Sequence, residues 1–547
     1  MPLTPLPHSA ILRLPLPLLV CMLLTSSLAA ATYYVSPTGL DTNNGAIDKP
    51  WLTPDKAVAT AVAGDVVLFR GGTYPITKRI EPKKSGTAEK WITFAGYPGE
   101  KPLIDGTGYI PSNGQHDNGL FNIVGPGYLR FINMHVTMSH GMGFTVRGPS
   151  HHVELIECSS HETFAPGIGL WNCQYVKVMY CEITGATTNR MRLYGDFNQE
   201  APHEAISSGG AKYFEIAYNH VHDCDKEGID IKEVSAHGTV HHNYVHDMPR
   251  QGLYTDAWFG VLEDVEFRDN VVHNCEWGIG VSSEGSSASL RNVRIRNNLF
   301  YNNRGSGIFF SLWGGDGPRS QIVIANNTFY KNGSPTHWSG PTGSIDLRSV
   351  NVQDITVVNN LCVGGGAYEI ATFDNPATNG LDQLTAKNVV IKYNLTETFK
   401  DDTNRTFLYG RNYALLGDNP ITGTAGLTNP TRGSFYLTEP SRARIAGSPD
   451  PAYLINGQPA DLGAFAFGLN NIPDAPSVLE PAYGSIWRIV QSTVPGRTYL
   501  RQQSSDLGTW TDAPAPEPAN YLPDLFYFDT AGGEPIFFRY KITDLAQ

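Results

Sequence analysis

The chain has 547 residues, of which 56 are glycine and 37 are proline, and 11% of its residues are aromatic. This composition is typical of a strand-rich protein with many turns, and it argues against a helical bundle. The formal net charge of −12 argues against nucleic acid and anionic membranes as partners, because both are negatively charged.

The first 31 residues have the features of a secretory signal. They contain a single arginine, an apolar run from Leu14 to Leu28 and alanines at positions 29–31. Segments of this kind are removed during export. After it, no stretch reaches the ~18 apolar residues that a membrane span needs. We therefore expect residues 1–31 to be a signal peptide and the mature protein to be a secreted monomer, extracellular or periplasmic, with no membrane partner.

Residues 32–125 begin the mature chain. TYYVSPTGLDTNNGAIDKPW predicts a strand and a turn, residues 54–63 a short helix, and VVLFRGGTYPI a further strand. This stretch resembles the start of secreted right-handed parallel β-helix proteins of the pectate-lyase-like superfamily, where it caps the β-helix. DLGAFAFG at positions 461–468 resembles the phrase that closes many of them. The resemblance implies a fold but not a reaction, because the superfamily holds lyases, glycoside hydrolases, epimerases and inert proteins.

Two short phrases alternate along the middle of the chain. The first reads GIDIKEV, GLYTDAW, GIGVSSE, GIFFSLW and SIDLRSV between Gly228 and Val350. The second ends in an asparagine, with spacings of 24, 27, 28, 29 and 33 residues, at Asn219, Asn243, Asn270, Asn298, Asn327 and Asn360. Short strands at this period, with the extra length in the connections, indicate stacked parallel coils. We therefore predict an all-β fold, a right-handed single-stranded parallel β-helix over residues 32–469 that forms the catalytic domain.

Residues at equivalent positions of successive coils predict the interior of the turns. We expect the recurring asparagines to form a hydrogen-bonded ladder, with Cys158 and Cys181 at the same position in earlier coils. Cys224 and Cys275 share another column but lie two coils apart, too far for a disulfide when coils are ~4.8 Å apart.

Histidines form a separate column. His222, His246 and His273 each follow the ladder asparagine by three residues, and Tyr301 and Tyr330 continue the series. A column along the coil axis stacks its rings, whereas a metal site needs side chains that converge on one ion. We therefore expect stacking at this column, and the metal content of the protein stays open.

Alignment of the first phrase separates an inward face from an outward face. The inward residues are mostly apolar, as strand alternation requires of a core. The outward residues combine acids, one lysine and aromatic rings on what we expect to be one exposed sheet face, with Gly280 giving room in the middle. Sugar rings stack on Trp and Tyr while their hydroxyls bond to carboxylates, so this pattern favours a polysaccharide or oligosaccharide substrate.

The outward face supplies the candidate site residues. The candidate catalytic residues are Asp256, Glu284, Asp230 and Lys232. The candidate substrate-binding residues are Tyr254, Trp258, Trp313, Arg250, Glu204 and Arg348. The insertion at 189–203 and the GGDGPR segment after Trp313 are expected to form opposite walls of the cleft, because loops on one side of a coil usually carry specificity.

Paired carboxylates predict a glycoside hydrolase, which needs no cofactor. Such enzymes hold two carboxyl groups roughly 5 Å apart for retention or about 6.5–9.5 Å apart for inversion. Asp256 and Glu284 lie on neighbouring coils with Cα atoms about 8 Å apart, and Asp230 with Asp256 has similar geometry, so the pair and the stereochemistry stay open. GLYTDAW and GIGVSSE also resemble coils of β-helix hydrolases of xylosides or fucosides, which implies Asp256 as nucleophile or base and Glu284 as general acid.

Two other functions stay open. KEGID resembles part of the acidic calcium phrase of lyases in polysaccharide lyase family nine, which implies β-elimination on a uronate glycan, with Lys232 as base and Ca²⁺ as cofactor. Lys226 stands where those lyases have an acid, and GLYTDAW and GIGVSSE contain no lysine. The other alternative is a β-helix that binds glycans without catalysis.

The end of the chain has the pattern of a separate unit. We predict a linker over residues 470–482, where NNIPDAPSVLEP contains several prolines, and a small β-sandwich-like module over residues 483–547, where alternating strands recur. Its RTYLxxxSxDLxxW pattern resembles accessory modules of secreted bacterial enzymes, which implies an anchoring, sorting or carbohydrate-binding role.

Overall fold

The structure is a computed structural model, and it describes most of residues 30–544. The stretches outside the description are 1–29, 113–115, 193–199, 350, 375–386, 398–405, 408–409, 466–477, 484–485, 492, 494–496, 505–508, 510, 513–521, 523, 530–536 and 545–547. The predicted signal peptide therefore lies almost entirely outside the described residues. Among the residues that are described, no helix is long and apolar enough to cross a membrane.

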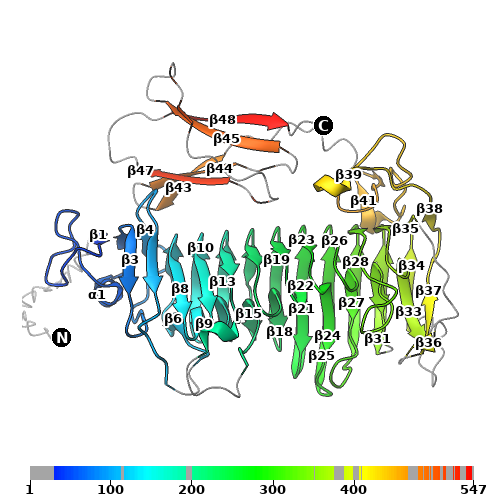
Figure 1. The fold of residues 1–547 in the computed structure, drawn as a ribbon, viewed down its shortest axis with the longest axis horizontal. Helices are drawn as coiled ribbons and strands as arrows, with labels where there is room; N and C mark the ends of the chain where they lie inside the picture. Colours follow the sequence, from blue (N-terminus) through cyan, green and yellow to red (C-terminus); the bar gives the residue numbers. More distant parts are fainter. Residues whose placement is uncertain are drawn as a thin grey trace, which may run out of the picture.

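Three long sheets run side by side along the molecule, and successive coils contribute one strand to each of them (Figure 1). The first sheet comprises β1 (Thr32–Val35), β2 (Val66–Phe69), β4 (Ile92–Gly96), β7 (Leu129–Ile132), β10 (His151–Ile156), β13 (Gln174–Met179), β16 (Glu215–Ala217), β19 (Ala236–His241), β22 (Gly260–Arg268), β25 (Ala288–Arg296), β28 (Arg319–Ala325), β31 (Val352–Val358) and β34 (Val389–Lys392).

The second sheet comprises β3 (Gly72–Pro75), β5 (Pro102–Asp105), β8 (His135–Ser139), β11 (Ser159–Thr163), β14 (Glu182–Thr184), β17 (His220–His222), β20 (Tyr244–His246), β23 (Val271–His273), β26 (Leu299–Tyr301), β29 (Thr328–Tyr330), β32 (Leu361–Val363), β35 (Leu395–Thr396) and β38 (Ile421–Thr422). The third comprises β6 (Gly119–Val124), β9 (Met142–Arg147), β12 (Ile168–Trp171), β15 (Ile206–Gly209), β18 (Ile229–Lys232), β21 (Gln251–Ala257), β24 (Trp277–Ser283), β27 (Ile308–Phe310), β30 (Ile345–Leu347), β33 (Ile370–Asp374), β37 (Gly410–Ala414) and β36 (Thr406–Phe407).

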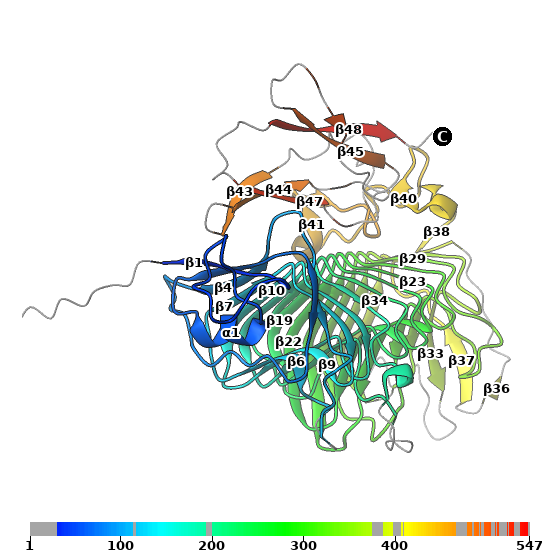
Figure 2. The ribbon, with the colours of Figure 1, turned by 60° about the vertical axis from the view of Figure 1, so that its left-hand side comes forward.

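The predicted β-helix is confirmed by this topology. Strands that pair are one coil apart in the sequence and run parallel, except where β37 and β36 close the third sheet in antiparallel fashion. The predicted short helix is present as α1 (Pro54–Thr60), which begins after Thr53 because the Thr53 hydroxyl accepts a hydrogen bond from the Lys56 amide. It lies at the N-terminal end of the β-helix (Figure 2).

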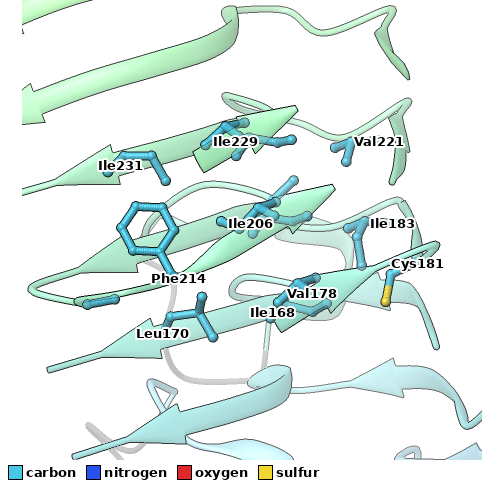
Figure 3. Packing of buried hydrophobic residues seen from close by; sticks show 14 of the residues in the cluster. Ile168, Leu170, Val178, Cys181, Ile183, Ile206, Phe214, Val221, Ile229 and Ile231 are labelled. Atoms are coloured by element: carbon cyan, nitrogen blue, oxygen red, sulfur yellow. The ribbon is translucent and has the colours of Figure 1, made fainter. Parts of the chain in front are cut away.

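The core is built from columns of like residues. In the third sheet, Ile206 pairs with Ile229, Ile229 with Leu253, and Leu253 with Ile279, and all four side chains are fully buried. Figure 3 shows rows of such side chains pointing into the space between the sheets. The stacking buries apolar surface continuously along the axis, which provides most of the stabilisation of a solenoid.

The predicted asparagine ladder is confirmed at the corner between the first and second sheets. It runs through Asn219, Asn243, Asn270, Asn298, Asn327, Asn360 and Asn394, where each side-chain amide donates to the next asparagine oxygen at 2.9–3.0 Å. At the start of the ladder, the backbone N–H of Cys181 donates to the side-chain oxygen of Asn219 at 2.9 Å. The residue before each rung is left-handed, with φ of 53–60°, so the chain turns sharply there.

The C-terminal module is antiparallel throughout. It contains β43 (Val478–Tyr483), β44 (Ile486–Gln491) and β47 (Asp524–Asp529) in one sheet, and β46 (Thr511–Asp512), β45 (Arg497–Ser504) and β48 (Phe537–Asp544) in another. Strand β43 begins at Val478, inside the predicted linker 470–482. Tyr483 and Ile486 pack on Leu68, Ala95 and Ile132, whose side chains point outward from the first sheet.

The remaining short elements close the C-terminal end of the β-helix. They are β39 (Leu427–Asn429), η2 (Pro430–Arg432), β40 (Ser434–Leu437), η3 (Pro451–Tyr453), β41 (Leu454–Ile455) and β42 (Gln458–Pro459), together with the single turn η1 (Asn189–Met191) in the insertion before β15. Leu437 and Leu462 pack on Leu361 and Leu395 of the second sheet, which covers the outward face of its last coils.

The ladder predicts a large effect of a single buried amide. Asn298→Ala removes an acceptor for the Asn270 backbone N–H and donors to the Phe267 carbonyl and to Asn327. Each buried group left without a partner costs about 1–3 kcal/mol, so we expect the free energy of unfolding to fall by about 2–5 kcal/mol. Denaturant titration measures it. Arg294→Ala in the same coil, at an exposed position, is the control and should change stability by no more than about 0.5 kcal/mol.

Candidate active site

The candidate residues come together on the outward face of the third sheet. Asp230 and Lys232 are on β18, Tyr254 and Asp256 are on β21, and Glu284 directly follows β24. Parallel pairing sets Lys232 beside Asp256 and Asp230 beside Tyr254, so the acids of three consecutive coils converge.

The prediction of an exposed face is wrong in one respect. The side chains point away from the core, but Asp230 is completely buried, and Lys232, Asp256 and Glu284 expose at most 9% of their surface. The acidic groups are therefore held in a shielded environment, where electrostatic interactions are stronger than at a solvated sheet face.

A cavity of about 600 Å³ opens onto this face. Its lining includes seven of the candidates: Glu204, Arg250, Tyr254, Asp256, Trp258, Glu284 and Trp313. It also includes Glu227, Gln251, Glu276, Trp277 and Trp338, which the repeat alignment did not select because they precede the aligned phrase or lie in an insertion. Asp230, Lys232 and Arg348 lie behind the lining and not in it.

Lys232 lies at the centre of a buried charge cluster. Its Nζ donates to both Glu204 carboxylate oxygens at 2.9 and 2.7 Å and lies 3.7 Å from Asp230. Burial alone would raise the pKa of Glu204, but the Lys232 ammonium lowers it to about 2. Burial lowers the pKa of Lys232, yet Glu204 and Asp230 outweigh this effect and hold it above its ordinary value. Lys232 is therefore a permanent internal cation.

The pKa of Asp230 is shifted in the opposite direction from that of Glu204. Neither of its carboxyl oxygens has a hydrogen-bond partner among the described residues, although the side chain is fully buried. Burial and the nearby Glu204 carboxylate raise its pKa well above the ordinary value, against the attraction of Lys232. Asp230 therefore holds its proton more readily than an ordinary aspartic acid, and it lies behind the cavity lining.

Asp256 and Glu284 form the acid pair that faces the cavity. Burial, and then the charge of Glu284, raise the pKa of Asp256 to about 8. Trp258 Nε1 donates to Asp256 Oδ2 at 3.0 Å, while Oδ1 has no partner in the described part of the chain. Burial also raises the pKa of Glu284, but the Tyr254 hydroxyl, which donates to Oε1, partly counters this. Asp256 therefore keeps its proton to a higher pH than an ordinary aspartic acid.

Glycines leave the space that Tyr254 and Glu284 occupy. A Cβ on Gly280 would lie 2.6 Å from the Tyr254 ring, so only glycine lets Tyr254 lie across β24 and reach Glu284, as the alignment suggested. Gly314 has φ +65° and approaches the Glu284 backbone closely, and the Gly315 amide donates to the Glu284 carbonyl. The segment after Trp313 therefore holds Glu284 in place.

Aromatic side chains wall the cavity. Trp277 stacks on Phe309 with ring centroids 5.4 Å apart and meets Trp313 and Trp338 edge to face. Trp338 exposes 71% and Trp258 exposes 52% of its surface, which leaves ring faces free for a ligand. Residues 193–199 of the predicted wall at 189–203 lie outside the described residues, while the wall that carries Trp338 belongs to the insertion before β30.

Arg348 was expected to bind substrate, but it does not line the cavity. Its guanidinium donates to Asp346 at 2.7 Å and to the backbone carbonyls of Ser339 and Pro341 at 2.6 and 2.9 Å. It is buried beneath the insertion that carries Trp338 and fastens that insertion to the sheet. Arg250, in contrast, lines the cavity and pairs with Glu227 at 3.1 Å.

Comparison with known proteins agrees with the fold. A family model described as "Pel9A-like, right handed beta helix region" matches residues 33–189, and a model described as "Right handed beta helix region" matches residues 118–315. Together they span 33–315, just over half of the chain. The chain belongs to the pectate-lyase-like superfamily of right-handed β-helix proteins.

Individual relatives in this superfamily are distant. The uncharacterized protein YwoF of Bacillus subtilis (strain 168) is 26% identical over 374 residues, 61% of this chain and 74% of YwoF. Pectate lyase PEL9 of Emericella nidulans is 46% identical over 77 residues, only 14% of this chain and 19% of PEL9. The crystal structure of pectate lyase Pel9A covers 81% of this chain and 98% of its own, at 15% identity and a TM-score of 0.47. A segment of 77 residues is thus similar to part of a pectate lyase.

The charge cluster behind the cavity gives a stability prediction. Lys232→Met leaves the Glu204 carboxylate buried without its cation, and removal of one partner of a buried pair costs about 3–5 kcal/mol. We expect the free energy of unfolding to fall by that amount in denaturant titrations at neutral pH. The double variant Lys232→Met with Glu204→Gln should recover most of the loss, because no buried charge is then left alone. Equal instability of the single and double variants would contradict this account.

Proposed function

We propose that the protein is a secreted glycoside hydrolase that cleaves a neutral glycan, with Asp256 as general acid and Glu284 as base or nucleophile. The observation that carries the proposal is the pair of carboxyl groups in a cavity lined with tryptophan, where burial, and then the charge of Glu284, raise the pKa of Asp256 to about 8. Glycoside hydrolysis needs a pair of this kind, since one carboxyl group protonates the leaving oxygen while the other is ionised.

The environment of each group supports its role. Asp256 has a pKa of about 8, and its Oδ1 has no hydrogen-bond partner among the described residues. Glu284 accepts from the Tyr254 hydroxyl, and the pKa of Tyr254 is raised far above its ordinary value by burial, so this donor stays protonated. A carboxylate held by such a donor is oriented for attack on a sugar or on water. These roles are the reverse of those that the resemblance to xyloside and fucoside hydrolases implies.

The cavity lining supports a neutral substrate. Among the described lining residues, Arg250 is the one basic side chain, while five are acidic: Glu204, Glu227, Asp256, Glu276 and Glu284. A uronate chain would meet net negative charge there. Exposed Trp258 and Trp338 instead offer faces for the C–H surfaces of neutral sugars.

A polysaccharide lyase is the second candidate, and the Pel9A-like family match and the segment shared with PEL9 favour it. The geometry of the proposed base argues against it. Lys232 Nζ donates to both Glu204 oxygens, is kept protonated, and lies behind the cavity lining. The carboxylates that would bind Ca²⁺ in this interpretation are Glu227 and Asp230 of KEGID, and each already lies beside a cation, Arg250 at 3.1 Å from Glu227 and Lys232 at 3.7 Å from Asp230. These residues do not fit a calcium site.

One assay separates the three functions. Purified mature protein is incubated with neutral and uronic-acid polysaccharides, and reducing ends and the ultraviolet absorbance of unsaturated products are followed. We expect new reducing ends without absorbance on a neutral glycan. Absorbance would establish a lyase, and binding with neither signal would establish a glycan-binding protein. Asp256→Asn and Glu284→Gln should each reduce hydrolysis about 10²–10⁴-fold, while Arg294→Ala on the first sheet should leave it unchanged.

The roles of the two acids give a pH prediction. The raised pKa of Asp256 means that its protonated form is present at neutral pH and is lost as pH rises through about 8. We therefore expect kcat/KM to fall above about pH 8, and to fall at acidic pH as Glu284 becomes protonated. Asp256→Asn should abolish the alkaline limb.

A substrate with an activated leaving group distinguishes the two carboxyl groups. An aryl glycoside whose leaving group needs no proton should be cleaved almost normally by Asp256→Asn and poorly by Glu284→Gln. The opposite result would assign the roles as the resemblance implies.

A further inference from the structure

A cluster of histidines lies on the outward face of the second sheet, away from the acid pair. His220 and His222 are on β17, and His246 is on the paired strand β20. The predicted column is confirmed: His222, His246, His273 and Tyr301 stack with ring centroids 4.4–5.1 Å apart. His220 does not belong to this column, because it pairs with Tyr244 at a different position along the strand.

His220 makes the cluster converge. One ring nitrogen from each of His220, His222 and His246 lies within 4.8 Å of the others. His220 Nε2 is 2.8 Å from His246 Nε2, and its ring is inclined by 40° to that of His246. Two imidazole nitrogens on one tetrahedral zinc ion are about 3.3 Å apart, so small side-chain shifts would admit an ion.

Neighbouring carboxylates select the ring nitrogens that face the centre. His222 Nδ1 donates to Asp223 at 2.7 Å, and His246 Nδ1 donates to Asp247 at 2.6 Å. With the Nδ1 atoms fixed as donors, the Nε2 atoms of neutral rings present lone pairs. Carboxylates in this position are typical of metal-binding histidines, where they fix the tautomer and make the ligand more basic.

Two further observations favour a bound ion over ring stacking alone. His222 Nε2 is buried and has no hydrogen-bond partner among the described residues. Glu182 Oε1 lies 3.7 Å from it and 4.0 Å from His220 Nδ1, too far for hydrogen bonds, so its carboxylate adds negative charge beside the cluster. The three imidazoles expose 15–21% of their side-chain surface, so an ion can enter from solvent.

We propose that His220, His222 and His246 form a binding site for a divalent transition-metal ion of the zinc type, which links two successive coils. Three imidazole donors, with the fourth position left to water, suit Zn²⁺ and not Ca²⁺ or Mg²⁺. The site is separate from the acid pair and does not depend on the proposed hydrolase activity.

The test is a metal titration of untagged mature protein after dialysis against EDTA. Calorimetry should show one Zn²⁺ per chain, Co²⁺ should give the intense visible bands of tetrahedral coordination, and Zn²⁺ should raise the melting temperature. His220→Ala should abolish all three signals. Asp247→Asn should weaken Zn²⁺ binding about 10–100-fold, because the carboxylate supports a ligand without touching the ion.

His273→Gln is the matched control. His273 stacks on His246 in the same column but lies outside the cluster, so this variant should bind Zn²⁺ as the unmodified protein does. Absence of Zn²⁺ binding by the unmodified protein, or equal loss in the His273 and His220 variants, would overturn the proposal. Circular dichroism of each variant without metal shows whether it is folded, so a folding defect is not mistaken for loss of the site.

Discussion

Parallel pairing between neighbouring coils is the constraint on which the rest of the structure depends. It fixes the register, so each residue lies beside its counterpart one coil away, as Ile229 does beside Leu253. An inward column of like residues then forms a continuous apolar core, and the asparagines form a continuous ladder. The same pairing sets Lys232 beside Asp256, which brings ionisable groups from different coils into one cluster.

The register also explains how several acids can be buried so close together. Lys232 holds the pKa of Glu204 low, at about 2, against the effect of burial. Burial, and then the charges of Glu204 near Asp230 and of Glu284 near Asp256, raise the pKa of those two acids although Lys232 opposes the rise. Such separation of pKa values is the usual basis for assigning acid and base roles at a catalytic site.

The repeat alone was enough to predict the β-helix, the ladder and the acid-bearing coils, because register makes spacing in the sequence equivalent to position in space. It could not show which side chains line the cavity. Trp338 is in an insertion without a counterpart in other coils, and Glu276 and Trp277 precede the aligned phrase. The anchoring role of Arg348 depends on the insertion that carries Trp338, and periodicity carries no information about that insertion.

Core side chains and cavity side chains lie on opposite faces of the same strands. This explains why the fold carries so little information about the reaction. Thr255 and Val281 point inward, while their neighbours Asp256 and Ser282 point outward from the same strands. Exchange of an outward acid for a lysine changes the chemistry of the cavity without altering a single core contact. Lyases and hydrolases can therefore share these coils, and the side chains of the outward columns, with the pKa values that their neighbours impose, decide between them.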